Sequence, residues 1–147
     1  MKSILSFLAI VMASLLFISC GKKNDTDNST AIIGKWTAVK QYDKSYVAGQ
    51  LISSDTLAIV APDYATFEFK TGNVFASDYS VQGEEDHVTG YYKLQGNQIS
   101  VGATEADPEK EIYTYQLTGN SLTMSISYSD TVNSVIYRDD VKIELKK

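Results

Sequence analysis

The chain has 147 residues, of which 44% are apolar and 21% charged, enough for one globular domain with a packed core. Its net charge of −5 argues against a nucleic-acid-binding protein, which needs a basic surface. A single Cys excludes an intramolecular disulfide, and a single His argues against a His-rich metal site or a catalytic triad. We therefore expect no metal ion, no cofactor and no nucleic-acid partner.

Residues 1–19 have the features of a secretory signal peptide. Lys2 supplies a positive charge, and residues 4–18 are almost wholly apolar. A helix of about 15 residues spans only ~22 Å, whereas the hydrocarbon core of a bilayer is ~30 Å thick. A signal peptide therefore fits this stretch better than a transmembrane anchor does.

The end of this stretch, Leu15-Leu16-Phe17-Ile18-Ser19-Cys20, resembles the lipobox of bacterial lipoproteins. The resemblance implies cleavage before Cys20 and acylation of that residue by chains such as palmitate, which would anchor the protein to a membrane. Residues 20–31 would then form the lipidated Cys and a flexible, polar tether. Gly21 is compatible with export to the outer membrane of a Gram-negative cell, facing either the periplasm or the exterior.

From Ile33 onward, apolar and polar residues alternate with a period of two, which is typical of strands with one buried face. Leu122, Met124 and Ile126, for example, are separated by polar residues. We expect strands near 34–43, 63–70, 74–80, 88–94, 98–102, 111–117, 121–128, 132–138 and 141–146. Lys44–Pro62 is expected to be a long loop with a short helical turn, and Asp139-Asp140 the turn of the last hairpin.

Gly-Asn pairs at 96–97 and 119–120 suit two-residue hairpin loops, because such loops need residues that tolerate positive φ. These loops predict the cross-strand pairs Leu94–Ile99, Tyr92–Val101, Leu117–Leu122 and Tyr115–Met124. A longer loop around Gly72-Asn73 would pair Phe69 with Phe75. Sequential hairpins favour an all-β fold, an antiparallel up-and-down β-barrel of about eight strands, over a sandwich.

Gly34-Lys35-Trp36 resembles the Gly-x-Trp signature of lipocalins, and residues 88–99 followed by 117–122 look like small lipocalin-like domains of bacterial lipoproteins. The resemblance implies a lipocalin-like barrel over residues 32–147, with Trp36 at its closed end. It also implies an Arg from the last strand stacked on Trp36. Arg138 is the only Arg, and Lys146 is an equal candidate.

The sequence shows no convincing catalytic constellation. Glu84-Glu85-Asp86-His87 is the densest polar cluster, but adjacent loop residues rarely converge on one point. We interpret it as a solvated acidic loop and expect a non-catalytic protein.

Tyrosine is unusually frequent, with ten residues. Tyrosine fits half-buried strands in any case, so this enrichment alone does not indicate a site. If a pocket exists, the alternation places one group of residues on its inner face, namely Tyr92, Tyr113, Tyr115, Met124 and Tyr128.

Three functions stay open at this point. The first is a lipid-anchored, monomeric barrel that binds a small apolar or amphipathic molecule in a cavity beneath Lys44–Pro62. The second is a filled barrel acting as an accessory module, whose exposed tyrosines such as Tyr42, Tyr46 and Tyr91 contact another envelope protein or a glycan. The third is an enzyme that uses the loop around His87.

Overall fold

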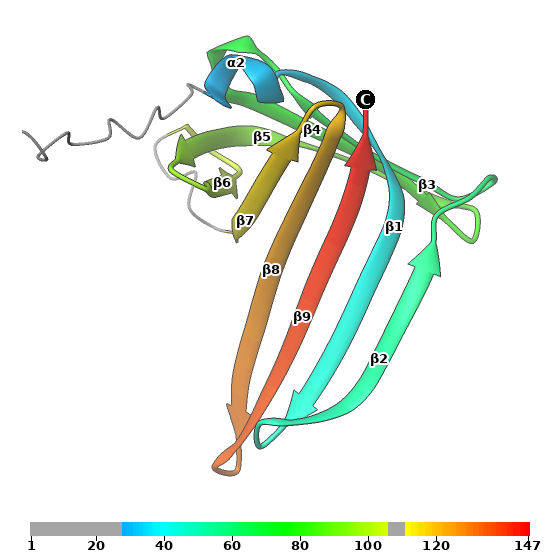
Figure 1. Cartoon of the computed structure of the whole chain (residues 1–147), viewed down its shortest axis with the longest axis vertical. Coiled ribbons are helices and arrows are strands. Elements are labelled where there is room, and N and C mark those ends of the chain that lie inside the picture. The colour runs from blue at the N-terminus through cyan, green and yellow to red at the C-terminus, as the bar shows by residue number, and fades with distance from the viewer. Residues whose placement is uncertain (1–27, 106–110) are drawn as a thin grey trace, which may run out of the picture.

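The computed structural model describes residues 28–105 and 111–147 (Figure 1). A short helix, α2 (Asn28–Ile32), precedes nine strands. These are β1 (Gly34–Val47), β2 (Gln50–Ala58), β3 (Tyr64–Phe69), β4 (Val74–Val81), β5 (Glu84–Gln95), β6 (Gln98–Gly102), β7 (Glu111–Thr118), β8 (Ser121–Val132) and β9 (Val135–Lys146). The predicted signal peptide, lipobox and most of the tether lie outside the described residues.

All strand pairs are antiparallel, and their order follows the chain from β3 to β9. The first part of β1 pairs with β3 and its opposite edge pairs with β9, which closes an eight-stranded barrel. β2 continues along the edge of β1 where β3 ends. Figure 1 shows the consequence: β1, β2, β8 and β9 extend as a long sheet well beyond the short strands β6 and β7. The predicted antiparallel barrel is confirmed.

The hairpin loops set the predicted registers. Gly96 and Gly119 adopt φ of 60° and 57°, so these two loops use the left-handed conformation that glycine favours. The pairs Leu94–Ile99, Tyr92–Val101, Leu117–Leu122 and Tyr115–Met124 form as predicted. The longer loop between β3 and β4, a 3-10 turn over Thr71–Asn73, does pair Phe69 with Phe75.

The predicted long loop at Lys44–Pro62 is wrong. β1 continues to Val47, the chain turns at Ala48-Gly49 with positive φ at both residues, and β2 runs back along β1. Every residue of β2 is exposed, so the segment has no buried face and no apolar alternation to reveal a strand. This segment is a strand because its backbone N–H and C=O groups pair with those of β1.

Two smaller predictions are also wrong. The last hairpin turns at Asn133-Ser134, both with positive φ, and Asp139-Asp140 lies within the continuous strand β9. The acidic run Glu84–His87 opens β5 instead of forming a loop. In both places the carboxylates lie away from the packed core and remain in contact with solvent. Their desolvation therefore costs little free energy when the segment forms a strand.

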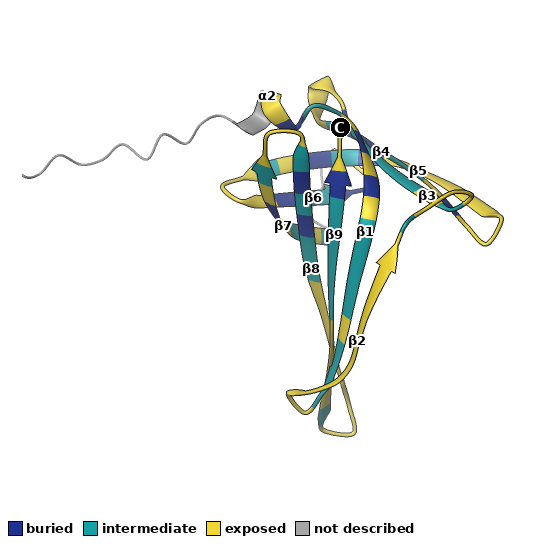
Figure 2. Ribbon diagram, turned by 45° about the vertical axis from the view of Figure 1, so that its right-hand side comes forward, coloured by how far each residue is buried: buried dark blue, intermediate teal, exposed yellow. Residues whose placement is uncertain are grey.

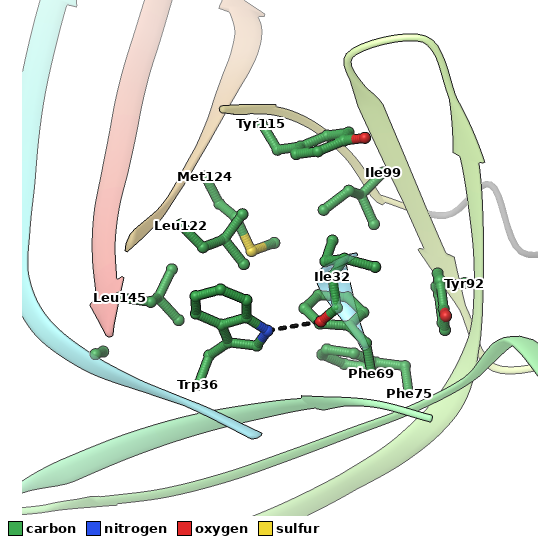
Figure 3. Close-up of a cluster of buried hydrophobic side chains, with 11 residues drawn as sticks. Ile32, Trp36, Phe69, Phe75, Tyr92, Ile99, Tyr115, Leu122, Met124 and Leu145 are labelled. Carbon is green, nitrogen blue, oxygen red and sulfur yellow. Dashed lines mark hydrogen bonds between the residues drawn. The ribbon is translucent and has the colours of Figure 1, made fainter. Parts of the chain in front are cut away.

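The hydrophobic core occupies one end of the barrel (Figure 2). Ile32 of α2 enters this end, and the buried ring nitrogen Nε1 of Trp36 donates a hydrogen bond of 2.7 Å to the Ile32 carbonyl (Figure 3). Around them pack Phe69, Phe75, Tyr92, Ile99, Tyr115, Leu122, Met124 and Leu145. These side chains fill this end of the barrel. Burial of each large apolar side chain stabilises the fold by roughly 1.5–3 kcal/mol.

Over the described part of the chain, the structure contains no helix with the length and apolar composition needed to cross a membrane.

Candidate functional site

Trp36 closes the filled end together with the C-terminal residue of the chain. The ammonium group of Lys147 lies 4.8 Å from the centre of the Trp36 ring and donates a hydrogen bond of 3.2 Å to the Ala31 carbonyl. Gly34, with φ of 129°, leaves room for this side chain, because a methyl group there would come within 2.8 Å of Lys147 Cε. The cation over the Trp36 ring is therefore Lys147, one residue beyond the end of β9.

Neither predicted partner of Trp36 reaches it. Arg138 lies far along β9, opposite Tyr46 in the register, and its guanidinium stacks 4.0 Å from the Tyr46 ring centre. Lys146 faces outward and donates a hydrogen bond to the Ser121 hydroxyl. Both residues alternate with the inward-facing Leu145, so the pleat of β9 directs them away from the barrel interior.

Three of the residues predicted to line a pocket belong to the packed core. Tyr92, Tyr115 and Met124 are at most 6% exposed. The Tyr92 hydroxyl donates a hydrogen bond of 3.2 Å to the Lys70 carbonyl, and the Tyr92 ring packs edge-on against Phe69. These side chains fill the barrel at this level, so they leave no space for a ligand there.

The other two predicted residues, Tyr113 and Tyr128, lie where the core ends. The Tyr113 hydroxyl donates a hydrogen bond of 2.7 Å to Glu111 Oε2. Burial, together with this carboxylate, holds the pKa of Tyr113 far above its ordinary value of 10. Tyr128 is 48% exposed, and burial also raises its pKa. Both hydroxyls therefore stay protonated at neutral pH and can donate or accept hydrogen bonds.

An apolar pocket of about 220 Å³ opens beside the core, between β1–β2 and β3–β4. Aliphatic and aromatic side chains dominate its walls, with a few polar groups among them. The lining comprises Ala38, Gln41, Leu57, Ala58, Ile59, Asp63, Tyr64, Ala65, Phe67, Ser77, Tyr79, Ser80, Val81 and Ile143.

None of the five residues predicted to line a pocket contributes to this one, although Leu57, Ala58 and Ile59 come from the segment predicted to lie over a cavity. This pocket is difficult to predict from the local sequence. Its walls depend on β2 and on the register shift between Ala38 and Lys40 in β1, and alternation counted along the chain reveals neither.

The two faces of the described strands differ in charge. The registers place one set of charged residues on the same face as the core, and all of them are carboxylates: Asp43, Asp55, Glu84, Asp86, Glu111, Asp130 and Asp139. The basic residues within the described strands all take outward positions: Lys35, Lys40, Lys44, His87, Lys93, Arg138, Lys142 and Lys146. The concave side, onto which the pocket opens, is therefore negative.

A second polar group lies on the outer face of β3–β5. Asp78 contacts the imidazole nitrogen Nδ1 of His87, the Lys35 ammonium at 3.9 Å and the Thr66 hydroxyl at 3.4 Å. The hydrogen bond from His87 lowers the pKa of Asp78, with Lys35 and Thr66 acting in the same direction. His87 is thus an exposed side chain oriented by a carboxylate across neighbouring strands.

Among residues 28–105 and 111–147, no group of three or more His, Cys, Asp and Glu side chains is placed to hold a metal ion.

The outer face of the long sheet carries a shallow groove of about 340 Å³, over β1, β9 and β8. Tyr42 and Tyr46 line it, and cations cover both rings: Lys142 lies 3.9 Å from the centre of Tyr42, and Arg138 lies over Tyr46. Tyr91 lies on β5, outside this groove. Two of the three tyrosines expected on an outer surface therefore share one face.

No known family model matches the chain, and no curated protein is significantly similar to it in sequence.

Proposed function

We propose that this protein is a membrane-anchored, lipocalin-like lipoprotein that binds a small apolar or amphipathic molecule at the cell envelope and catalyses no reaction. The observation that carries the proposal is the apolar pocket beside the filled core. Ligand sites are typically concave and mostly apolar, with a few polar groups that orient the ligand. Gln41, Asp63 and Tyr79 supply such groups here.

The size of the pocket restricts the ligand. A volume of about 220 Å³ is below the range common for drug-sized ligands. It equals the share of about seven water molecules at ~30 Å³ each. A short alkyl chain or one to two rings would fill it, and any longer part would extend along the concave face of the long sheet.

The binding test uses N-phenyl-1-naphthylamine, a neutral probe whose fluorescence rises in apolar surroundings. We expect a Kd of roughly 10–100 µM, as for a ligand of this size. Ala65→Phe places a ring in the pocket and should weaken binding about ten-fold. Thr114→Phe, at an exposed outward position of β7, is the matched control and should bind normally.

The expected melting temperature of Ala65→Phe is close to that of the wild type, because Ala65 lies beside open space. Absence of probe binding by the wild-type protein, or equal binding by the folded Ala65→Phe variant, would refute this part of the proposal.

The envelope location rests on the sequence of residues 15–21. Labelling of growing cells with an alkyne-bearing palmitate should mark the wild-type protein in the outer-membrane fraction. Cys20→Ser should abolish the label, since the chain has a single Cys. An unlabelled wild-type protein in the soluble periplasmic fraction would contradict the anchoring while leaving ligand binding unaffected.

The groove on the outer face favours a second function, contact with an acidic glycan. Lys44 lies in the groove, and it forms no ion pair with another described residue. In affinity electrophoresis, an acidic polysaccharide in the gel should retard the wild-type protein. It should retard a Lys44→Ala/Tyr46→Ala variant less. Equal mobility of the two proteins would remove this candidate.

A further inference from the structure

A pair of facing carboxylates lies two residues beyond the pocket on β1 and β2. Gln41 and Leu57 line the pocket and lie opposite each other on β1 and β2. Two residues further along both strands, on the same inward face, Asp43 and Asp55 are again directly opposite. A ligand that fills the pocket and extends toward the open end therefore meets two carboxylates.

Among the described residues, no cation neutralises these two facing carboxylates. Cβ atoms of directly opposite residues lie about 4.5–5.5 Å apart, and like charges in such a pair destabilise the sheet. Gln41 Nε2 donates hydrogen bonds of 3.0 Å to both oxygens of Asp43, and the Ser53 hydroxyl donates one of 2.8 Å to Asp55. Both donors are neutral, and neither carboxylate forms an ion pair with another described residue.

The opposite wall is negative as well. Tyr79 lines the pocket, and its hydroxyl donates a hydrogen bond of 3.0 Å to Asp86. That carboxylate, with a smaller contribution from Glu84, raises the pKa of Tyr79. Asp63 lines the pocket too and accepts a hydrogen bond of 2.9 Å from the backbone N–H of Gln82. Carboxylates thus border the pocket on two walls, while the cations of the strands lie on the other face.

We propose that the ligand is a cationic amphipath, whose apolar part occupies the pocket and whose ammonium or similar group lies at Asp43 and Asp55. This inference rests on the proposed function and narrows it to one class of ligand. An ammonium group neutralises the facing carboxylates, whereas a fatty acid or another anionic amphipath would add a third negative charge there.

The test compares three probes with the same eight-carbon chain and different head groups: octyltrimethylammonium, octanol and octyl sulfate. Calorimetric titration uses residues 21–147, which contain every described element, at low salt and below the critical micelle concentrations. We expect octyltrimethylammonium to bind about ten-fold more tightly than octanol, the effect of two exposed ion pairs. Octyl sulfate should bind least, and about 0.5 M NaCl should reduce the difference.

Two variants locate the charge effect. Asp43→Asn/Asp55→Asn should reduce the preference for the ammonium probe to less than about two-fold, with octanol binding retained. Asp140→Asn/Glu144→Gln removes the same charge from the outer face of the same sheet and should keep the full preference. Should the first variant fail to fold, the single Asp55→Asn change at an exposed position should still lower the preference measurably.

The outcomes separate the two proposals. Binding of all three probes with equal affinity would overturn the inference and leave the pocket as a neutral apolar site. Tighter binding of octyl sulfate, or an equal loss of preference in both double variants, would overturn it too, the latter because net charge alone would explain the result. Absence of binding by every probe would refute the proposed function, and the inference with it.

Discussion

Replacement of Lys147 by Ala should loosen the closed end of the barrel, while replacement of Arg138 should not. The Lys147 ammonium covers the Trp36 ring at 4.8 Å and donates to the Ala31 carbonyl at the end of α2. Arg138 contacts Tyr46 and Asp140 near the opposite end of β9. The two changes remove one positive charge each, so a general charge effect would affect both proteins alike.

The expected magnitude follows from these two contacts. A cation over an aromatic ring at an exposed site contributes about 0.5–1 kcal/mol, and a hydrogen bond about 0.5–1.5 kcal/mol. Ordering the long Lys147 side chain offsets part of this sum. We therefore expect Lys147→Ala to lower the free energy of unfolding by about 1 kcal/mol, which corresponds to roughly 4 °C in Tm for a domain of this size.

Gly34→Ala tests the same contact from the other side. Its φ of 129° is strained for alanine, at about 1–3 kcal/mol, and the added methyl group would displace Lys147. In the Gly34→Ala/Lys147→Ala double variant the displaced side chain is already absent. The double variant should therefore lose about 1 kcal/mol less than the sum of the two single changes.

Trp36 makes these measurements direct, because it is the only Trp in the chain and is fully buried. Urea unfolding followed by its fluorescence gives the free energies. The emission maximum of the folded protein should shift with Lys147→Ala and stay unchanged with Arg138→Ala. Equal destabilisation by both changes, or strict additivity of the Gly34 and Lys147 changes, would refute the assignment of Lys147 as the residue that covers Trp36.

Three further predictions concern the core and the titrating groups. Met124→Ala should lower the free energy of unfolding by about 2–5 kcal/mol, whereas Leu57→Ala at the exposed pocket wall should lower it by less than about 0.5 kcal/mol. Equal losses for the two variants in urea unfolding would contradict the placement of the core. The Asp78 carboxyl should have a pKa below 3.8 in an NMR titration, so its contact with His87 stabilises the fold at higher pH and is lost on acidification. His87→Ala should return the pKa of Asp78 toward 3.8, and an unchanged pKa would exclude His87 as the cause. Tyr113 should remain protonated in the folded protein well above pH 10, so the free energy of unfolding should fall as pH rises past 10, where only the unfolded state ionises. In an absorbance titration, Tyr113→Phe should lose the part of the phenolate signal that appears last, and a variant that keeps this part in full would disprove the assignment.

The sequence predicted the barrel well where the information is local. A two-residue loop fixes which residues face each other, so Gly96-Asn97 and Gly119-Asn120 determined the registers of two hairpins. Alternation in β7 and β8 then identified the buried face, which includes Tyr115 and Met124. These predictions hold because the residues that decide them are neighbours along the chain.

The candidate site was less predictable, because its parts come from distant segments. Tyr92, Tyr115 and Met124 were correctly assigned to the inner face, but the sequence does not show that inward side chains fill the barrel at this level. The pocket depends on β2, whose exposed and polar residues resemble a loop until β1 supplies its backbone partners. Asp43 and Asp55 face each other only because that pairing exists.

The strand class, the inward alternation and the two-residue hairpins could be predicted from the sequence, since each depends on side-chain periodicity or on a turn residue within a few positions. Whole-strand pairing, by contrast, closes the barrel between β1 and β9, stacks Lys147 on Trp36 and places the basic residues of the described strands on the outer face. Closure brings together residues more than a hundred positions apart, and the single-residue bulge after Ala38 reverses which side chains of β1 face inward. A one-residue shift moves every later side chain to the other face, and only the pairing of whole strands determines where that shift occurs.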